Sequence, residues 1–137
     1  MDKFLFYREW CRILIECNIE YLKSEDPYLV EDVIKEEYRL LDVLNKAYEQ
    51  KNLTTLKRFF KDLTADSLEI CSASKRQLVN ARLRAVCGED LTKYDKKLAN
   101  SVQRIVKRGK IRNGNEYEKV RTYIDSIKNE SLSILLF

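Results

Sequence analysis

The chain is poor in glycine and proline, the two residues that tight turns depend on. It holds three glycines and one proline in 137 residues, whereas roughly 7% and 5% are usual. A fold of many short strands needs such turns at close intervals, so long helices with few connections are expected instead. Hydrophobic residues make up 45% of the chain, enough to close a core. We therefore expect an all-α fold, a single domain over residues 1–137 built as a compact bundle of about six helices.

The first half of the chain predicts three helices. The first, over residues 3–23, is expected to be central and deeply buried, with one polar stripe at helical spacing: Glu9, Arg12, Glu16, Glu20 and Lys23. Asp26 is expected to cap a second helix, which begins at Pro27 and runs to about residue 51. Asn52 is expected to cap a third, interrupted near residues 64–67, whose inward side chains are Leu56, Phe59, Phe60, Leu63 and Ile70.

The second half predicts three more helices, two of them ended by glycine. The fourth is expected to run from a Ser74 cap to Gly88, with inward Val79, Leu83 and Val86. The fifth starts at Asp90 or Thr92 and ends at Gly109, with inward Tyr94, Leu98, Val102 and Ile105. Asn113 and Glu116 resemble a capping box for a sixth helix. That helix is expected to bury Tyr117, Val120, Ile124 and Ile127, and Ile111 before it to plug the core.

Several kinds of chemistry lack the residues that they need. The chain contains no histidine, the commonest general base and a common metal ligand. Glycine-rich phosphate loops are missing too. The four cysteines form no C-x-x-C pair and are expected to be free core residues of a cytoplasmic protein: Cys11, Cys17, Cys71 and Cys87. Charges interrupt the apolar N-terminal segment, so neither a signal peptide nor a membrane span is expected. We expect no catalytic site, no metal and no cofactor.

The charge changes sign along the chain. Residues 1–69 carry 11 Lys/Arg against 15 Asp/Glu, a net −4, and residues 70–137 carry 15 against 7, a net +8. An acidic patch around the start of the second helix could bind a basic partner protein by electrostatic complementarity. It consists of Glu25, Asp26, Glu31, Asp32, Glu36 and Glu37. An ordinary solvated helix face would show the same residues.

A basic surface is expected over residues 75–112. Its side chains are of the types that read base edges and neutralise phosphates: Arg76, Gln77, Asn80, Arg84, Lys93, Lys97, Asn100, Arg104 and Lys107. No helix-turn-helix signature accompanies them, and a surface for an acidic protein, or a merely solvated face, fits them as well. A small nucleic-acid-binding regulator is therefore an alternative to a protein-binding module.

Residues 131–137 are apolar apart from two serines. Such a segment either packs back onto the helices or docks into a partner. If the tail docks into a partner, that partner could be a second copy of the chain, which would give a homodimer held by the tail.

One segment near the C-terminus resembles a known kind of protein. Lys107-Arg108-Gly109-Lys110-Ile111-Arg112-Asn113, followed by Glu116-Tyr117 and by Tyr123-Ile124-Asp125, is similar to a closing helix-turn-helix element of small helical bacterial proteins. Some of those proteins resemble immunity proteins of polymorphic or contact-dependent toxins. The resemblance implies a bacterial cytoplasmic protein that binds and neutralises a cognate toxin, and it implies no catalytic residue. We therefore expect a non-enzymatic protein-binding module of the immunity or inhibitor type.

Overall fold

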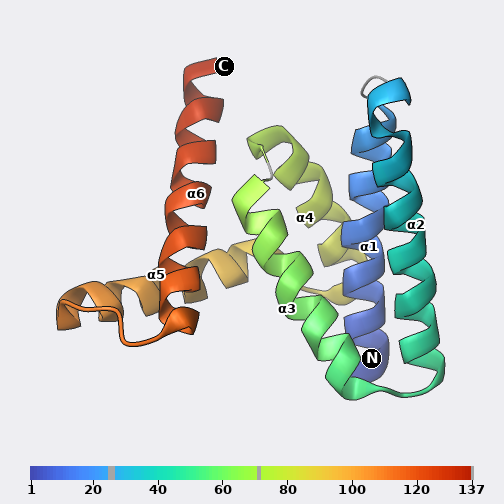
Figure 1. Ribbon diagram of the computed structural model, residues 1–137, viewed down its shortest axis with the longest axis horizontal. Helices are drawn as coiled ribbons and strands as arrows, with labels where there is room; N and C mark the ends of the chain where they lie inside the picture. The colour runs from blue at the N-terminus through green and yellow to red at the C-terminus, as the bar shows by residue number, and fades with distance from the viewer. Residues whose placement is uncertain (25–26, 71, 137) are drawn as a thin grey trace. The chain divides into compact units, whose positions relative to one another are not determined.

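A computed structural model of the chain confirms the expected all-α class. It describes the backbone of residues 1–24, 27–70 and 72–136, and the side chains of residues 1–24, 31–69 and 72–127. Within these ranges the chain forms six helices and no strand (Figure 1). They are α1 (Lys3–Lys23), α2 (Pro27–Glu49), α3 (Leu53–Ile70), α4 (Ala73–Cys87), α5 (Leu91–Arg108) and α6 (Gly114–Leu136).

The helices fall into two compact units. The first comprises residues 1–63 and 85–87, and the second comprises residues 64–84 and 88–137. Helices α3 and α4 therefore each contribute residues to both units. The organisation of the whole chain as a single domain stays a prediction.

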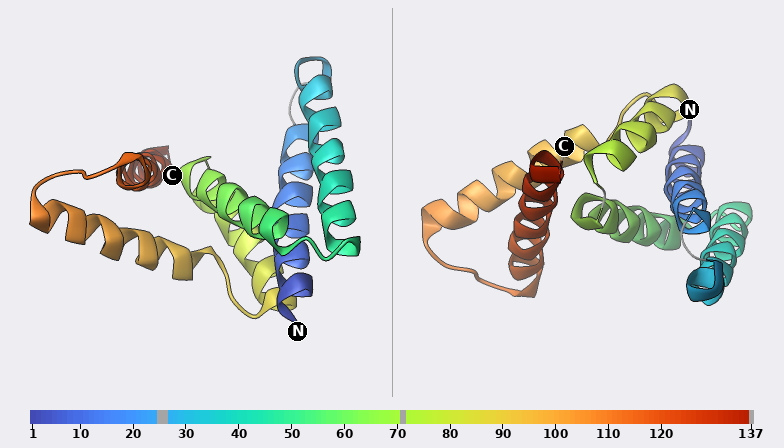
Figure 2. Two further views of the ribbon diagram at one scale, coloured as in Figure 1. Left: turned by 60° about the horizontal axis from the view of Figure 1, so that its bottom comes forward. Right: turned by 90° about the horizontal axis from the view of Figure 1, so that it is seen from above.

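The first unit is built on the deeply buried helix α1. This helix lies beside α2 (Figures 1 and 2), and its Trp10 and Cys11 are completely buried. An aromatic cluster joins α1 to the first part of α3, since the Phe60 ring lies 5.3 Å from that of Trp10 and 5.0 Å from that of Tyr7. The expected polar stripe is also present, because Arg12 pairs with both Glu9 and Glu16 along the helix.

Side-chain caps and left-handed glycines set the helix ends, largely as predicted. Asn52 Oδ1 accepts a hydrogen bond from the Thr55 N–H at 3.1 Å at the start of α3, and Asp90, rather than Thr92, caps α5. Gly88 and Gly109 end α4 and α5 with φ of +79° and +87°, a conformation that glycine adopts at little cost.

Two predicted helix boundaries are wrong. Helix α3 continues without interruption through residues 64–67, because Thr64 and Leu68 are both buried and keep that face packed. Helix α4 is capped by Ser72 instead of Ser74, and its Oγ accepts a hydrogen bond from the Lys75 N–H at 3.3 Å. Serine has the same capping chemistry at both positions, so the earlier one extends the helix. The predicted Asp26 cap lies outside the described residues.

Helix α6 buries a different face from the one predicted. Tyr117, Ile124 and Ile127 are 55%, 46% and 43% exposed, while Thr122 and Ser126 on the opposite side are buried. The Thr122 hydroxyl donates a hydrogen bond to the Glu69 carboxylate on α3 at 3.1 Å. A polar contact inside the second unit therefore sets the inward face of α6.

Two further side chains predicted to face inward lie outside instead. Val86 near the end of α4 is 40% exposed, and Ile111 between α5 and α6 is 46% exposed. Ile111 does not plug the core because the connection is held by polar contacts: Glu116 accepts hydrogen bonds from the Arg112 N–H at 2.8 Å and from the Arg108 guanidinium.

The cysteines and the tail are described only in part. Cys11 and Cys17 are buried, and Cys87 is partly buried. Cys71 and the side chains of the apolar tail, residues 131–137, lie outside the described residues, so a homodimer through the tail stays a prediction. No helix in the described part of the chain is long and apolar enough to cross a membrane.

Candidate binding surface on α5 and α6

Helix α5 divides its circumference between an apolar face and a basic stripe. Leu91, Val102 and Ile105 are buried on one side. The other side carries five cations, which we call the basic stripe: Lys93, Lys96, Lys97, Arg104 and Lys107. At 100° per residue these cations share roughly a third of the circumference, and at 1.5 Å per residue they cover about 21 Å of the helix. The stripe is therefore a continuous, elongated positive surface.

Three cations of the stripe meet no carboxylate within the described part of the chain: Lys96, Arg104 and Lys107 are exposed and form no ion pair there. Lys93 pairs with Glu89 at 2.8 Å, and Lys97 lies over the Tyr94 ring at 5.3 Å. The positive charge is thus least neutralised toward the C-terminal half of the stripe.

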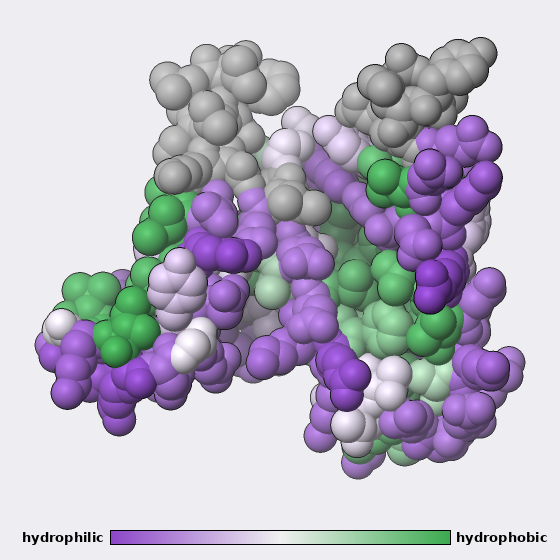
Figure 3. Space-filling view, viewed as in Figure 1, coloured by the Kyte–Doolittle hydropathy of each residue, from purple (hydrophilic) through white to green (hydrophobic). Residues whose placement is uncertain are grey.

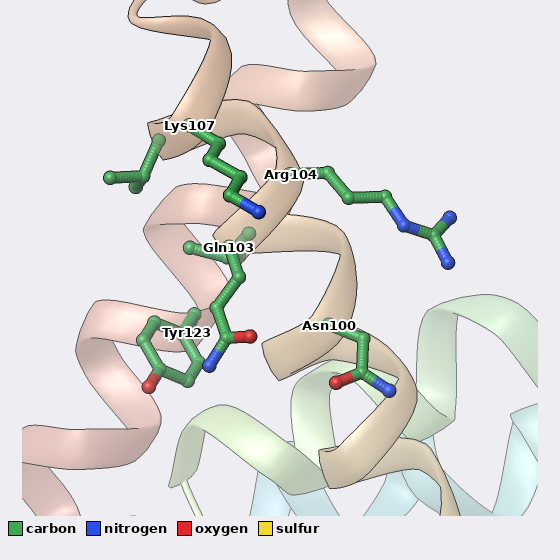
Figure 4. Close-up of a pocket in the computed structure, with 7 residues that line it drawn as sticks. Asn100, Gln103, Arg104, Lys107 and Tyr123 are labelled. Atoms are coloured by element: carbon green, nitrogen blue, oxygen red, sulfur yellow. The ribbon is translucent and has the colours of Figure 1, made fainter.

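A hollow between α5 and α6 adjoins that half of the stripe. It has a volume of about 670 Å³ and is lined by Asn100, Val102, Gln103, Arg104, Val106, Lys107 and Tyr123. Figure 4 shows the Gln103 side chain beside the Tyr123 ring, which α6 contributes, and Arg104 extending from α5 away from α6. The hollow therefore combines two cations, two amides, a phenol and two valines.

Apolar surface interrupts the polar surface at this end of α5. Val106 is 70% exposed and Ile111, in the connection to α6, is 46% exposed. In Figure 3 apolar surface is visible near this connection, with hydrophilic side chains around it. The hollow is consequently bordered by both kinds of surface.

The expectation that helix α4 presents Arg76 and Asn80 outward is wrong. Arg76, whose side chain is 12% exposed, pairs with Asp95 at 2.8 Å and donates to the Leu68 carbonyl at 2.9 Å. Asn80 is buried, and its Oδ1 accepts a hydrogen bond from the Leu91 N–H at 3.0 Å. Both side chains connect elements of the second unit, so neither is available to read a base edge.

Two other members of the predicted basic surface lie on the exterior of α4. Arg84 is exposed but pairs with Asp90 at 2.5 Å, while Gln77 is exposed. Of the predicted cations, Arg104 and Lys107 on α5 therefore have no carboxylate partner among the described residues, and together with Asn100 they line one hollow.

The predicted acidic patch is partly neutralised by its own helix. On α2, Glu31 lies 3.6 Å from Lys35 and Glu36 lies 3.4 Å from Arg39. Asp32 is exposed and Glu37 half-buried, and Glu25 and Asp26 lie outside the described residues. These i,i+3 and i,i+4 pairs are typical of a solvated helix face.

The turn from α5 to α6 is fixed electrostatically. The pKa of Glu116 lies below its ordinary value, first because the carboxylate accepts the Arg112 N–H and then because Arg108 bonds to it. Asn113 Oδ1 accepts the Glu116 N–H at 2.9 Å, so half of the predicted capping box is present, and the Glu116 side chain bonds one residue earlier than predicted. This turn positions Tyr123 on α6 beside α5.

Besides Val102, which was predicted to face inward, four residues of this surface were missed from the sequence: Lys96, Gln103, Val106 and Tyr123. Lys96 and Gln103 follow the same helical spacing as the predicted cations and could have been included. Val106 and Tyr123 could not, because their contribution depends on how α6 lies against α5.

No protein-family model matches the chain, and the comparisons with curated proteins and with solved structures give no match either. Within the described residues, no group of three or more metal-ligating side chains is arranged to hold a metal ion.

Proposed function

We propose that the chain is a non-enzymatic protein-binding module that receives an acidic surface of another protein on its basic stripe and the adjoining hollow. The observation that carries the proposal is that Arg104 and Lys107 meet no carboxylate among the described residues, yet line the same hollow as exposed Val106 and Tyr123. Interfaces between proteins are enriched in arginine and tyrosine and combine an apolar centre with a polar rim.

The basic stripe is favoured over the acidic patch as the working surface because its charges are less neutralised. Glu31 and Glu36 already have cationic neighbours on their own helix. An incoming partner would compete with those neighbours, whereas a carboxylate arriving at Arg104 or Lys107 meets no competing carboxylate among the described residues. Complementary charge of this kind speeds association and selects the partner.

The kind of partner is suggested by the resemblance of segments within residues 107–125 to a closing element of small helical bacterial proteins, some of which resemble immunity proteins. We propose an inhibitory role, in which the module binds a toxin or a comparable protein in the bacterial cytoplasm. No step of this proposal requires the module to carry out chemistry.

A matched pair of charge-reversal variants tests the proposal in a pull-down from the protein's own cell lysate, treated with nuclease. The Arg104→Glu/Lys107→Glu variant should lose a stoichiometric protein that the wild type captures. The Lys57→Glu/Lys61→Glu variant changes the net charge equally at exposed positions of α3 and should retain it. Retention of the partner by the first variant, or its loss from both, would contradict the proposal.

A nucleic-acid-binding regulator is the second candidate, favoured by the length and continuity of the basic stripe. Phosphate contacts release counterions, so affinity should fall steeply as salt rises. In this candidate Arg76 and Asn80 do not contact bases, since Arg76 pairs with Asp95 and Asn80 accepts a hydrogen bond from the Leu91 N–H inside the second unit. Duplex DNA that binds the wild type with a steep salt dependence, but not Arg104→Glu/Lys107→Glu, would favour it over the protein partner.

A further inference from the structure

Val106 is an unusual residue for the solvent-facing side of a basic helix. Its side chain is 70% exposed, and of the residues three and four positions before it on the same face, Gln103 is exposed and Val102 is buried. An amphipathic helix normally carries polar residues where it meets water. A single exposed valine is common enough by itself, so its surroundings have to decide whether it has a role.

Leu78 on α4 shows what an exposed apolar side chain looks like without such surroundings. It is 67% exposed but does not line the hollow. Val106, in contrast, lines a concave surface together with Tyr123, Arg104 and Lys107. Binding hot spots have this composition, with an apolar or aromatic centre that a polar rim shields from water.

The size of the hollow also fits more than a single ion. Its volume of about 670 Å³ lies within the range of pockets that hold a ligand of drug size, roughly 300–1,000 Å³. One large side chain together with the peptide groups on either side of it can therefore enter. Asn100 and Gln103 each bring an amide that can both donate to and accept from such peptide groups.

We infer that the partner inserts one aliphatic or aromatic side chain, flanked in its sequence by carboxylates, into this hollow. The inserted side chain packs on Val106 and the Tyr123 ring, and the carboxylates face Arg104 and Lys107. This inference rests on the proposed function and specifies the recognition element of the partner. It commits the surface to a protein, because a phosphate backbone gains nothing from an aliphatic side chain at Val106.

Two end-capped peptides of equal charge, GEELEEG and GEESEEG, probe the inserted side chain separately from the carboxylates. Fluorescence anisotropy would measure their binding to the wild type and to two variants, Val106→Ser and Leu78→Ser. Both substitutions lie at highly exposed positions, so the fold should be unchanged, which circular dichroism can confirm. The wild type and Leu78→Ser should bind the leucine peptide about tenfold more tightly than the serine peptide, since burying one such side chain is worth about that factor.

The Val106→Ser variant should bind both peptides with the weaker affinity. Equal affinity of the wild type for the two peptides, or tighter binding of an oligothymidine of equal charge, would overturn the inference. So would a failure of both peptides to bind. In these cases the proposed function still stands if Arg104→Glu/Lys107→Glu loses the cellular partner, and it fails separately if that variant keeps the partner.

Discussion

Replacing Asn80 by Ala should reveal whether this residue belongs to the fold or to a binding surface. Its Oδ1 accepts a hydrogen bond from the Leu91 N–H at 3.0 Å, and Leu91 is completely buried. The first N–H groups of a helix have no partner within the helix. The Asn80→Ala variant therefore leaves the first N–H of α5 without its partner in a site that water does not reach.

The loss in the free energy of unfolding can be estimated from the hydrogen bond that Asn80→Ala removes. An unsatisfied buried donor costs about 1–3 kcal/mol, and alanine returns roughly 0.5 kcal/mol through its higher helix propensity. The free energy of unfolding should thus fall by about 0.5–2.5 kcal/mol. With a urea m-value of about 2 kcal/mol/M for a small protein, the unfolding midpoint should fall by roughly 0.3–1.2 M.

Urea unfolding monitored by circular dichroism measures this change, and Gln77→Ala on the same helix is the matched control. Gln77 is also an amide but is exposed, so its removal should change the free energy of unfolding by no more than about 0.5 kcal/mol. Hydrogen exchange adds a local readout, because the Leu91 amide should exchange faster in Asn80→Ala. An unchanged midpoint together with unchanged Leu91 exchange would refute the structural role and return Asn80 to the candidate surface.

Two further predictions concern titration. Glu116 has a lower pKa in the folded than in the unfolded chain, so its ionised carboxylate stabilises the fold above the unfolded pKa, and this stabilisation is lost as the pH falls through the folded pKa. Below about pH 4.5 the wild type should therefore lose more stability than Glu116→Gln. Equal losses of the two proteins between thermal melts at about pH 7 and about pH 3 would contradict this. Burial, and secondarily Cys87, raises the pKa of Cys11 to about 12, so iodoacetamide at about pH 8 should alkylate Cys11 only after unfolding, as peptide mass mapping can check.

Local signals in the sequence were enough to predict the helices. The bounds of α1 were predicted correctly because its apolar positions and polar stripe follow one period throughout. Asn52, Gly88 and Gly109 marked helix ends because capping depends on neighbouring residues alone. Ser72 was missed because a second serine two residues later offers the same chemistry.

Helix faces were harder to predict, as α6 shows. The 3-4-3 spacing of Tyr117, Val120, Ile124 and Ile127 is a good apolar pattern, yet three of these side chains are exposed. The inward face is set by Thr122, which bonds to Glu69 at 3.1 Å from a position 53 residues earlier. A hydrogen bond between such distant residues leaves no periodic signal in the sequence.

The candidate site shows the same limit, because the availability of a cation depends on its pairing as well as on its type. Asp95 is the sole acidic residue within α5, and it accepts Arg76 from α4 at 2.8 Å. That pair and the hydrogen bond to the Leu68 carbonyl hold Arg76 inside the second unit, whereas Arg104 and Lys107 have no carboxylate in the described part of the chain. A substitution of Arg76 would therefore mix a folding defect with any loss of binding. Charge reversal at Arg104 and Lys107 changes the surface alone, which is why these two positions separate function from stability.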